Sequence, residues 1–513
     1  MARPAILANQ IIVQLGNQNL EEWQKSYYDR FDNLTISVLS LGMKILLLQS
    51  SDFNQLEKTL EADQAVTALE YNYALQNTSM PKTNDPLLSQ QFNLDKIKLQ
   101  PVWKTTTGGH TSCGDEIVVA VSEVYCTQLD HPDLLENIWI NQQEIWNDGI
   151  DNDQNGYVDD YYGVNIPEKN GYFPTNCDRT HGTGVAGIIG ATTNNEVGIA
   201  GINWKIKLLL LRNGGTSAGF IESYNYIWSL RKKYNETNGK EGAYICVTNF
   251  SAALSGERPQ KHPIWCALYD SLGRQGIVSV AGTDNMDIDI DKAGSMPSLC
   301  TSPYLLIVNN VDLEDNLFYT ARSSRSIDLS APGVNILTTV ENSTYDLLSG
   351  SSFSCPTVAA SVALLYSLPS QRFCSYLQDS LAAAPLMVLN SILAGVDQVP
   401  QLQGKTKTGG RLNVENSLQY LTQRFTDSHV GSQDAALIYP NPTLNTFVWY
   451  AGLVPKESLL LTIFDAHGKQ LSQKRKSAEP FFETIDLSSF EPGFYWVQLA
   501  ASSAVKTVKI AKQ

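Results

Sequence analysis

The sequence contains no run of about 18 or more apolar residues, the length that a membrane-spanning helix requires. Basic residues are few, since 37 lysines and arginines stand against 52 aspartates and glutamates, giving a formal net charge of −15. A protein that binds nucleic acid needs an excess of lysine and arginine, so nucleic acid is not expected as a partner of this chain. Residues 1–14 lack a basic stretch followed by an apolar stretch of about 7–15 residues, so no signal peptide is expected there.

Metal-binding cysteine patterns are also missing. The eight cysteines lie between positions 113 and 374, and none forms a CxxC pair or a spacing typical of zinc. Two interpretations stay open. An exported protein would use some of them in disulfides, whereas buried free thiols are the alternative.

The length and composition indicate a globular protein of several domains. At roughly 100–200 residues per domain, 513 residues predict about three domains. Apolar residues make up 43% and charged residues 17% of the chain, which argues against bulk disorder. Polar, turn-rich segments at 77–86 and 424–433 divide the chain into domains at 1–80, 86–422 and 434–513.

Apolar patterning differs among the three segments. Strand patterns at 11–15, 44–48 and 66–75 alternate with helical spacing in the first, which predicts a small α+β domain. In the middle segment, strands at 117–121, 206–211, 243–247, 276–280 and 305–308 are apolar at nearly every residue and alternate with helices at 184–190, 221–232, 263–272 and 356–368. Such strands are buried on both faces, so we expect an α/β fold of three layers around a parallel sheet.

The last segment carries short strand patterns and turns. The strands lie at 459–464, 483–487, 494–499 and 505–510, separated by His-Gly at 467–468 and Pro-Gly at 492–493. This pattern predicts an antiparallel β-sandwich of about 80 residues.

Two features of the middle segment point to nucleophilic catalysis. His181 opens a helix of small residues, and Ser352 precedes an apolar, buried helix with Pro356 in its first turn. At that position the serine hydroxyl and its own backbone N–H face the same space, so one turn supplies a nucleophile and an oxyanion donor. His181 is the candidate base. In an α/β sheet of this kind, such groups gather at the carboxyl ends of the strands.

An acidic loop at 148–160 resembles part of a calcium loop. Oxygen-bearing side chains alternate along it, and a glycine at 156 permits a sharp turn. Position 12 of the loop is Tyr162 rather than glutamate, so the loop is not a complete EF-hand. The sequence predicts a structural calcium site, and an acidic surface turn is the alternative. The candidate ligands are Asp151, Asp153, Asn155 and Asp159.

Three segments, in this order, resemble the subtilisin-like serine peptidases. They are His-Gly-Thr-Gly-Val-Ala-Gly at 181–187, Ala-Pro-Gly-Val-Asn-Ile at 331–336, and the Gly350, Ser352 and Pro356 pattern. The resemblance covers about residues 86–420. It implies a three-layer α/β core and hydrolysis of peptide bonds in a peptide or protein substrate by Ser352 and His181. It also implies that domain 1–80 is a propeptide that assists folding and occludes the cleft until it is cut, the alternative being a small packing domain.

The chain departs from this family at three positions. Glu123 stands at the end of a strand where the family has the aspartate that orients the histidine. Its side chain is one methylene longer than aspartate, so we expect it to orient His181 imperfectly. Thr283 stands where the family has its oxyanion asparagine, so we expect its hydroxyl to donate to the oxyanion; Asn285 follows two residues later. In the expected substrate-binding segment, formed by Asn249, Ser251 and Ala253, the last residue replaces a glycine. Two functions therefore remain open: a secreted endopeptidase with weakened activity, or an inactive pseudopeptidase that acts as a binding or surface protein.

The tail resembles the type IX secretion sorting domain of Bacteroidetes. The resemblance rests on Ile-Tyr-Pro-Asn-Pro at 438–442, Ile-Phe-Asp-Ala-His-Gly-Lys at 463–469, Pro-Gly-Phe-Tyr at 492–495 and a lysine-rich end. It implies the type IX secretion machinery as a partner and an extracellular or cell-surface location.

Overall fold

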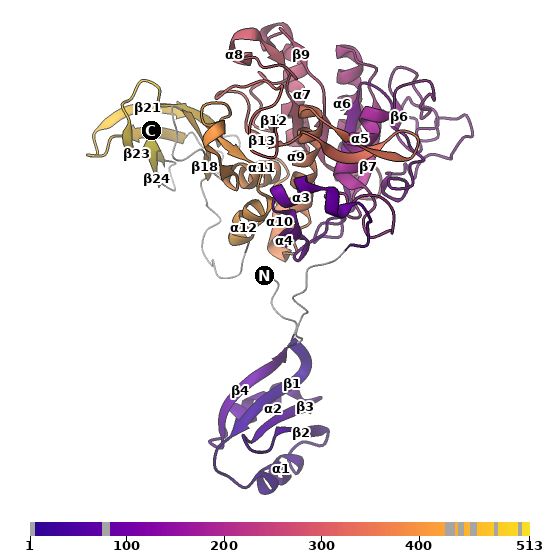
Figure 1. Ribbon diagram of the computed structural model, residues 1–513. Helices are drawn as coiled ribbons and strands as arrows, with labels where there is room; N and C mark the ends of the chain where they lie inside the picture. Colours follow the sequence, from indigo (N-terminus) through magenta and orange to yellow (C-terminus); the bar gives the residue numbers. More distant parts are fainter. Residues whose placement is uncertain are drawn as a thin grey trace. The chain divides into compact units, whose positions relative to one another are not determined.

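A four-stranded antiparallel sheet with two helices forms the first domain (Figure 1). Its strands follow the order β2-β3-β1-β4, and their apolar residues pack with Trp23 and Tyr27 of α1 and with Leu56 and Leu60 of α2. The sequence did not identify β2, because only Leu34 of its seven residues is buried. The elements are β1 (Ile6–Leu15), α1 (Leu20–Tyr28), β2 (Leu34–Ser40), β3 (Ile45–Ser50), α2 (Phe53–Glu61) and β4 (Val66–Tyr73).

This computed structural model describes residues 6–73, 83–425, 437–439, 446–451, 459–476, 481–500 and 505–512. The chain forms two compact units, Met1–Ser79 and Met80–Gln513. Most of the two predicted linkers, at 77–86 and 424–433, lies outside the described residues.

A nine-stranded, largely parallel sheet forms the centre of the middle domain and confirms the predicted α/β fold. The strand order is β16-β17-β13-β12-β10-β8-β5-β7-β6. All residues of the central strands β5, β8, β10 and β12 are buried, as their apolar sequences require. The strands are β5 (Ile117–Glu123), β6 (Val164–Asn165), β7 (Lys207–Arg212), β8 (Tyr244–Phe250), β10 (Val278–Gly282), β12 (Leu305–Val311), β13 (Leu329–Pro332), β16 (Asp397–Gln398) and β17 (Gly410–Arg411).

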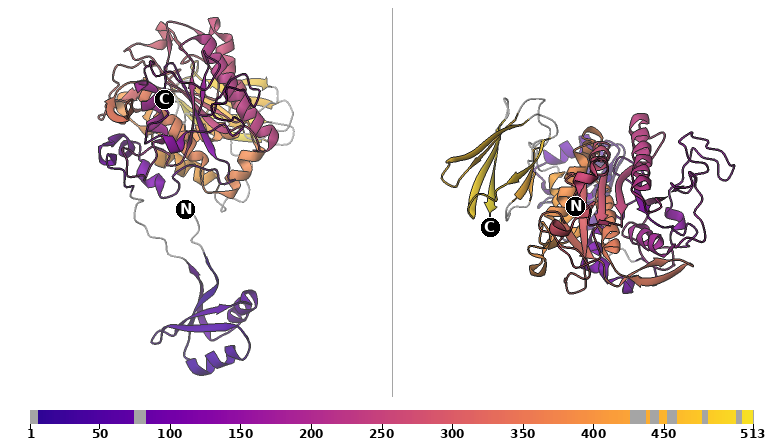
Figure 2. Two further views of the ribbon diagram at one scale, coloured as in Figure 1. Left: turned by 90° about the vertical axis from the view of Figure 1, so that its right-hand side faces the viewer. Right: turned by 90° about the horizontal axis from the view of Figure 1, so that it is seen from above.

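Helices cover both faces of this sheet (Figure 2). Helices α5, α9, α11 and α12 pack on one face, and α6 and α7 pack on the other. The four predicted helices correspond to α5, α6, α7 and α9, although the last was predicted to extend two residues beyond the end of α9. The helices are α3 (Phe92–Lys96), α4 (Leu99–Trp103), α5 (Thr180–Gly190), α6 (Ser217–Thr237), α7 (Pro263–Arg274), α8 (Ile290–Ala293), α9 (Ser351–Tyr366), α10 (Gln371–Asp379), α11 (Ala384–Ala394) and α12 (Val414–Arg424).

Two small antiparallel pairs and the tail complete the β-structure. The pairs are β9 (Leu254–Ser255) with β11 (Ser295–Met296), and β14 (Ile336–Val340) with β15 (Thr344–Leu348). In the tail, two antiparallel sheets share an apolar core, which confirms the predicted sandwich. Its strands are β18 (Leu437–Tyr439), β19 (Thr446–Ala451), β20 (Leu459–Phe464), β21 (Gln470–Lys476), β22 (Phe481–Asp486), β23 (Gly493–Ala500) and β24 (Val505–Lys512).

Both interpretations of the cysteines hold, for different residues. Disulfides join Cys113 to Cys374, Cys126 to Cys177, and Cys266 to Cys300. Cys246 and Cys355 are free and buried.

Within the described part of the chain, no single helix has the length and apolar composition to cross a membrane. Helices α9 and α10 pass that test only as a pair bent by 107°, and every residue of α9 is buried inside the protein.

Candidate active site

Glu123 ends the central strand β5, so the strand brings its side chain to the carboxyl edge of the sheet. The residue is 3% exposed. The backbone at this point is held by a 2.7 Å hydrogen bond from the N–H of Asn213 to the carbonyl of Glu123. A buried strand end fixed in this way presents a carboxylate in a defined position.

His181 lies in the first turn of α5, which packs unusually close to its neighbours. A Cβ atom at Gly187 would lie 2.2 Å from the Thr339 hydroxyl oxygen, so only glycine is accommodated there. Thr338 and Thr339 donate hydrogen bonds to backbone carbonyls of α5. The small residues around His181 in the sequence therefore lock the helix against β14 and fix the start of the helix.

The two side chains meet. Nδ1 of His181 lies 2.7 Å from Oε2 of Glu123, the distance of a charge-assisted hydrogen bond. Burial disfavours the charged imidazole, but the charge and the hydrogen bond of Glu123, together with Asp178, raise the pKa of His181 above its usual value. The extra methylene of glutamate therefore does not prevent the contact that the sequence analysis expected to be imperfect. The other oxygen, Oε1, is buried without a hydrogen-bond partner among the described residues.

Ser352 lies in the first turn of α9, which begins at Ser351, earlier than the sequence predicts, so Pro356 lies inside the helix rather than in its first turn. Gly350 precedes the helix with a φ of 144°, a conformation that side chains disfavour. The Ser251 hydroxyl donates to the carbonyl of Ser352 at 2.9 Å, and the Ser352 hydroxyl donates to the carbonyl of Ser251 at 3.3 Å. The turn that contains Ser352, the expected nucleophile and hereafter the nucleophile turn, is thus tied to the segment that follows β8.

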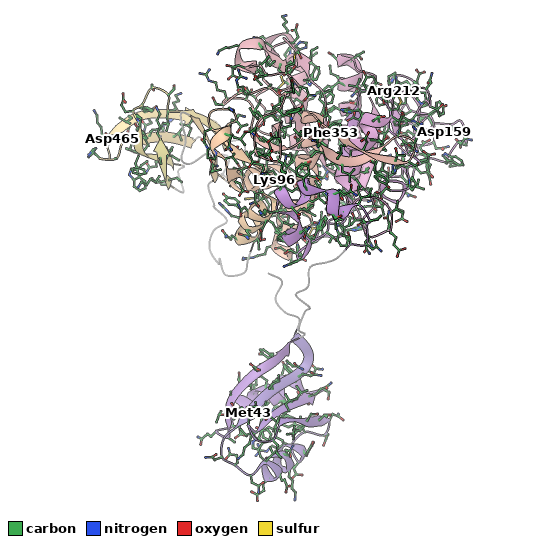
Figure 3. All side chains as sticks on the ribbon, in the orientation of Figure 1. Met43, Lys96, Asp159, Arg212, Phe353 and Asp465 are labelled. Atoms are coloured by element: carbon green, nitrogen blue, oxygen red, sulfur yellow. A yellow bond between two sulfur atoms is a disulfide. The ribbon has the colours of Figure 1, made fainter. Side chains whose placement is uncertain are left out.

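His181 reaches the turn of Ser352 through Phe353. The ring centroids of His181 and Phe353, which is labelled in Figure 3, are 5.6 Å apart, and Phe353 is 5% exposed. Among the described hydrogen bonds, none joins His181 to Ser352. Rotation about the Cα–Cβ bond of Ser352 changes the direction of its hydroxyl, and catalytic hydrogen bonds are often loose before substrate binds.

Two residues after β10 contact the turn before Ser352. The Thr283 carbonyl accepts a hydrogen bond from the Ser351 hydroxyl at 2.6 Å, while its own hydroxyl oxygen accepts one from Ser298 at 3.2 Å. Asn285 Oδ1 accepts the Ser351 N–H at 2.8 Å. A Cβ atom at Gly350 would lie 3.2 Å from Asn285 Nδ2, so the amide group lies beside the nucleophile turn.

Counting from the strand end does not select Asn285. Such counting assumes a regular strand, whereas β10 ends at Gly282 and the backbone bends at 285–287. The only available signal was the presence of an asparagine two residues beyond the expected place.

The expected substrate-binding residues mainly support this turn. Asn249, in β8, donates through Nδ2 to the Ser251 hydroxyl at 2.9 Å. The Ser251 hydroxyl in turn donates a hydrogen bond to the Ser352 carbonyl, as described above. Ala253 follows the end of β8 and is partly exposed. Two of the three residues thus position the expected nucleophile.

The acidic loop lies apart from this site, with Asp159 at the edge of the domain in Figure 3. Asp151 accepts hydrogen bonds from the N–H groups of Asn155 and Gly156, and Asp159 accepts from those of 148 and 149. These two carboxylates therefore cap turns of the loop. Asn155 donates through Nδ2 to Asp153 and to Asp160.

Asp153 instead converges with two residues that the sequence analysis did not select. One ligand atom from each of Glu144, Asp153 and Asp160 lies within 4.8 Å of the others. Glu144 is 4% exposed, and its Oε2 has no hydrogen-bond partner among the described residues. Burial, and then mutual repulsion, raises the pKa of Glu144 and of Asp160. Oxygen ligands clustered in this way suit a hard cation such as calcium.

Two family models match the chain. The model of the subtilase family matches residues 114–383, which is more than half of the chain. The model of a secretion system C-terminal sorting domain matches residues 437–513.

Curated relatives agree with the first match. Subtilisin-like protease 1 of Plasmodium berghei (strain Anka) is 28% identical over 66% of this chain and 54% of its own length. An extracellular protease of Xanthomonas campestris is 27% identical over 64% of this chain and 57% of its own. The major intracellular serine protease of Bacillus subtilis is 27% identical over 53% of this chain and 76% of its own. The chain thus spans little more than half the length of the first two relatives.

A solved protease structure from Pseudoalteromonas arctica aligns over 66% of this chain and 99% of its own, with 22% identity and a TM-score of 0.48. The structure of the epidermin leader peptide processing serine protease of Staphylococcus aureus aligns over 80% and 97%, with 14% identity and a TM-score of 0.49.

Proposed function

The chain belongs to the subtilase family, and on that premise we propose that it is a secreted serine endopeptidase. The observation that carries the proposal is the 2.7 Å contact between Glu123 and His181, since it supplies a carboxylate-oriented base beside the turn of Ser352. In an inactive protein, there would be no catalytic reason for the buried Glu123 carboxylate to contact the His181 imidazole.

The proposed reaction uses groups at the carboxyl edge of the sheet. Because Glu123 accepts the proton of Nδ1, the neutral imidazole presents Nε2 as the base. Nε2 takes the hydroxyl proton as Ser352 Oγ attacks the scissile carbonyl, and it returns that proton to the departing amine. Water then attacks the ester, with His181 acting again as base, which releases the acid and restores the serine.

The oxyanion of the tetrahedral intermediate needs donors placed before the reaction begins. We assign this role to the backbone N–H of Ser352 and to the amide of Asn285. The amide is fixed through Oδ1 by Ser351, which leaves the Nδ2 hydrogens available beside the nucleophile turn. The Thr283 hydroxyl, expected from the sequence to donate, is the second candidate for this position.

One observation favours the alternative of an inactive binding protein. The Ser352 hydroxyl is directed at the carbonyl of Ser251, at 3.3 Å, and not at His181. A cleft with this arrangement would still hold an extended peptide without cutting it.

Cleavage of an unstructured protein distinguishes the two functions. The purified chain should degrade such a protein, and it should cut itself between residues 77 and 90 if the first domain acts as a propeptide. Ser352→Ala should abolish both activities, while Ser349→Ala, a matched change at an exposed serine of the same segment, should retain them. Intact substrate with the wild-type chain would favour the binding protein.

The tail supports export. Its sorting domain indicates secretion, and we propose that the type IX machinery delivers the protein to the cell surface or the medium. The three disulfides suit that environment, because disulfides persist in oxidising compartments.

We further propose a structural calcium ion in the acidic loop, held by Glu144, Asp153 and Asp160. The unpartnered Oε2 of Glu144 supports this assignment, since a buried carboxylate oxygen without a donor needs a compensating charge. The predicted ligands Asp151 and Asp159 would shape the loop rather than bind the ion, because they lie outside this cluster and accept hydrogen bonds from backbone N–H groups of the loop. Calcium would supply the positive charge that holds the three carboxylates together.

A further inference from the structure

Three large apolar side chains stand in solvent at the start of the acidic loop. Ile145, Trp146 and Ile150 are 63%, 66% and 56% exposed, and they form the apolar tip of the loop. Asp159, which accepts hydrogen bonds from the N–H groups of 148 and 149, lies at the edge of the domain in Figure 3. Single apolar residues on a surface are common, whereas a group of them is typical of an interaction site.

Hydrogen bonds hold the apolar tip in one shape. The Ile145 N–H donates to Asn152 Oδ1 at 2.8 Å. Glu144 Oε1 accepts the N–H groups of Asn152 and Asp153, at 2.8 and 3.0 Å. The two ends of this segment are thus joined, so that Ile145 and Ile150 belong to one compact loop. A surface that is already ordered loses little conformational entropy when a partner binds.

The surroundings of the apolar tip are negatively charged. Between Lys104 and Lys169 the chain has thirteen aspartates and glutamates and no lysine or arginine. The lysines next to this region are already paired, Lys169 with Glu222 and Lys233 with Glu241. A divalent cation at the proposed calcium site would offset only part of this charge. The apolar tip therefore complements a partner that is both apolar and positively charged.

We propose that the apolar tip is a docking surface for protein segments that combine lysine or arginine with apolar residues. The apolar side chains of such a segment cover Trp146 and its neighbours, and its cations lie against carboxylates such as the exposed Asp148. A polypeptide fits better than a lipid surface, which is commonly anionic and would be repelled. It also fits better than a second copy of this chain, whose own net charge is −15.

This surface acts by binding alone, so the inference goes beyond the proposed hydrolysis and does not require it. In a peptidase, a docked segment would hold a protein substrate on the enzyme and raise its effective concentration. Short peptides without such a segment would gain nothing from the apolar tip.

The test measures binding to the Ser352→Ala chain, so that no peptide is cut. Three fluorescent dodecapeptides, with the repeats Lys-Leu-Ser, Glu-Leu-Ser and Lys-Ser-Ser, are titrated by anisotropy. The first should bind about tenfold or more tightly than either of the others, because it alone has both the charge and the apolar groups. Trp146→Ser combined with Ile150→Ser should remove this advantage. The matched control, Ile264→Ser with Leu313→Ser, changes residues of similar exposure, 66% and 53%, and should keep it.

A second measurement covers the case in which the loop variant does not fold. Asp148→Asn keeps an oxygen for the Ile150 N–H and removes one exposed charge. The Lys-Leu-Ser peptide should bind this variant about threefold more weakly. Its affinity for the Ser352→Ala chain should also fall as sodium chloride is raised from about 0.05 M to about 0.5 M, because salt screens charge pairs.

Equal affinity for the three peptides, an advantage that survives the loop variant, an equal loss in the control, or affinity that is insensitive to both Asp148→Asn and salt would overturn the inference. Loop-dependent binding of vesicles of phosphatidylcholine and phosphatidylglycerol, or a loop-dependent dimer in sedimentation, without an advantage for the Lys-Leu-Ser peptide would overturn it too. The partner would then be a membrane or a second copy. The proposed hydrolysis is judged separately, by cleavage with the wild-type chain.

Discussion

Replacing Glu123 by aspartate restores the residue that is typical of the family, yet the structure predicts that activity will fall. The aspartate side chain is shorter by one carbon–carbon bond of about 1.5 Å. Because Oε2 now lies 2.7 Å from Nδ1 of His181, the shortened carboxylate would lie about 4 Å away, beyond hydrogen-bond range. A misplacement of about 1 Å can cost about 10²-fold in rate, so kcat/KM should drop by about that factor.

The assay is kcat/KM on a fluorogenic peptide, with the thermal midpoint and circular dichroism measured to show that the fold is intact. Glu123→Gln is the companion variant, since it keeps the length and removes the charge. It should lose more activity, about 10⁴-fold, as when triad carboxylates are replaced in other serine peptidases. If Glu123→Asp equals or exceeds the wild type while Glu123→Gln is impaired, the carboxylate does not sit where the structure places it.

The remaining predictions concern the oxyanion donor, a disulfide and the cation site. Asn285→Ala should lower kcat by about 10²–10³-fold with KM little changed, whereas Thr283→Val should lower kcat much less. If Thr283→Val instead has the larger effect, threonine and not asparagine is the oxyanion donor. Cys126→Ser breaks the disulfide to Cys177, and Cys126 lies three residues beyond Glu123, so both the melting temperature and kcat/KM should fall; unchanged kcat/KM would show that the bridge does not position the Glu123–His181 pair. Calcium at 100 times its Kd should stabilise the wild type by about 2.7 kcal/mol in unfolding experiments. Glu144→Gln should lose that gain, and the exposed control Glu136→Gln should keep it; equal gains in both would exclude the buried cluster.

The pH profile of kcat/KM gives a further check on the pair. The imidazole acts as a base only when neutral, and Glu123 raises the pKa of His181 by stabilising the charged form. Activity should therefore rise with pH through a value above the ordinary pKa of about 6.5 for histidine. In Glu123→Gln the residual activity should rise at lower pH. An unshifted profile would mean that the carboxylate does not act on the imidazole.

Local signals in the sequence were enough to predict much of the fold. Strands that are apolar at nearly every residue could only be buried on both faces, which identified β5, β8, β10 and β12 and hence the parallel sheet. The helices at His181 and Ser352 were predicted from their small and apolar residues, but the start of α9 was placed too late because Pro356 lies inside the helix. By contrast, β2 was missed because it is an exposed edge strand with little apolar alternation.

The parts of the sites that escaped prediction depend on tertiary contacts. Asn285 contacts Ser351, beside the proposed nucleophile, because β10 ends at Gly282 and the backbone bends at 285–287, which no residue count reveals. Glu144 precedes the acidic loop, and Asp160 does not follow the alternating spacing of the loop, so the sequence pattern did not select either as a ligand. The fold brings both close to Asp153. The reach of Glu123 was underestimated for the same reason, since the backbone position of a strand end is set by its neighbours.

Covalent labelling by a fluorophosphonate tests the central claim most directly, because the probe reports whether His181 and Glu123 activate Ser352. Peptide mapping by mass spectrometry should find the label on Ser352 in the wild-type chain, and His181→Ala should slow its formation by several orders of magnitude. A wild-type chain that stays unlabelled, or labelling of Ser352 that is as fast without His181, would contradict the account.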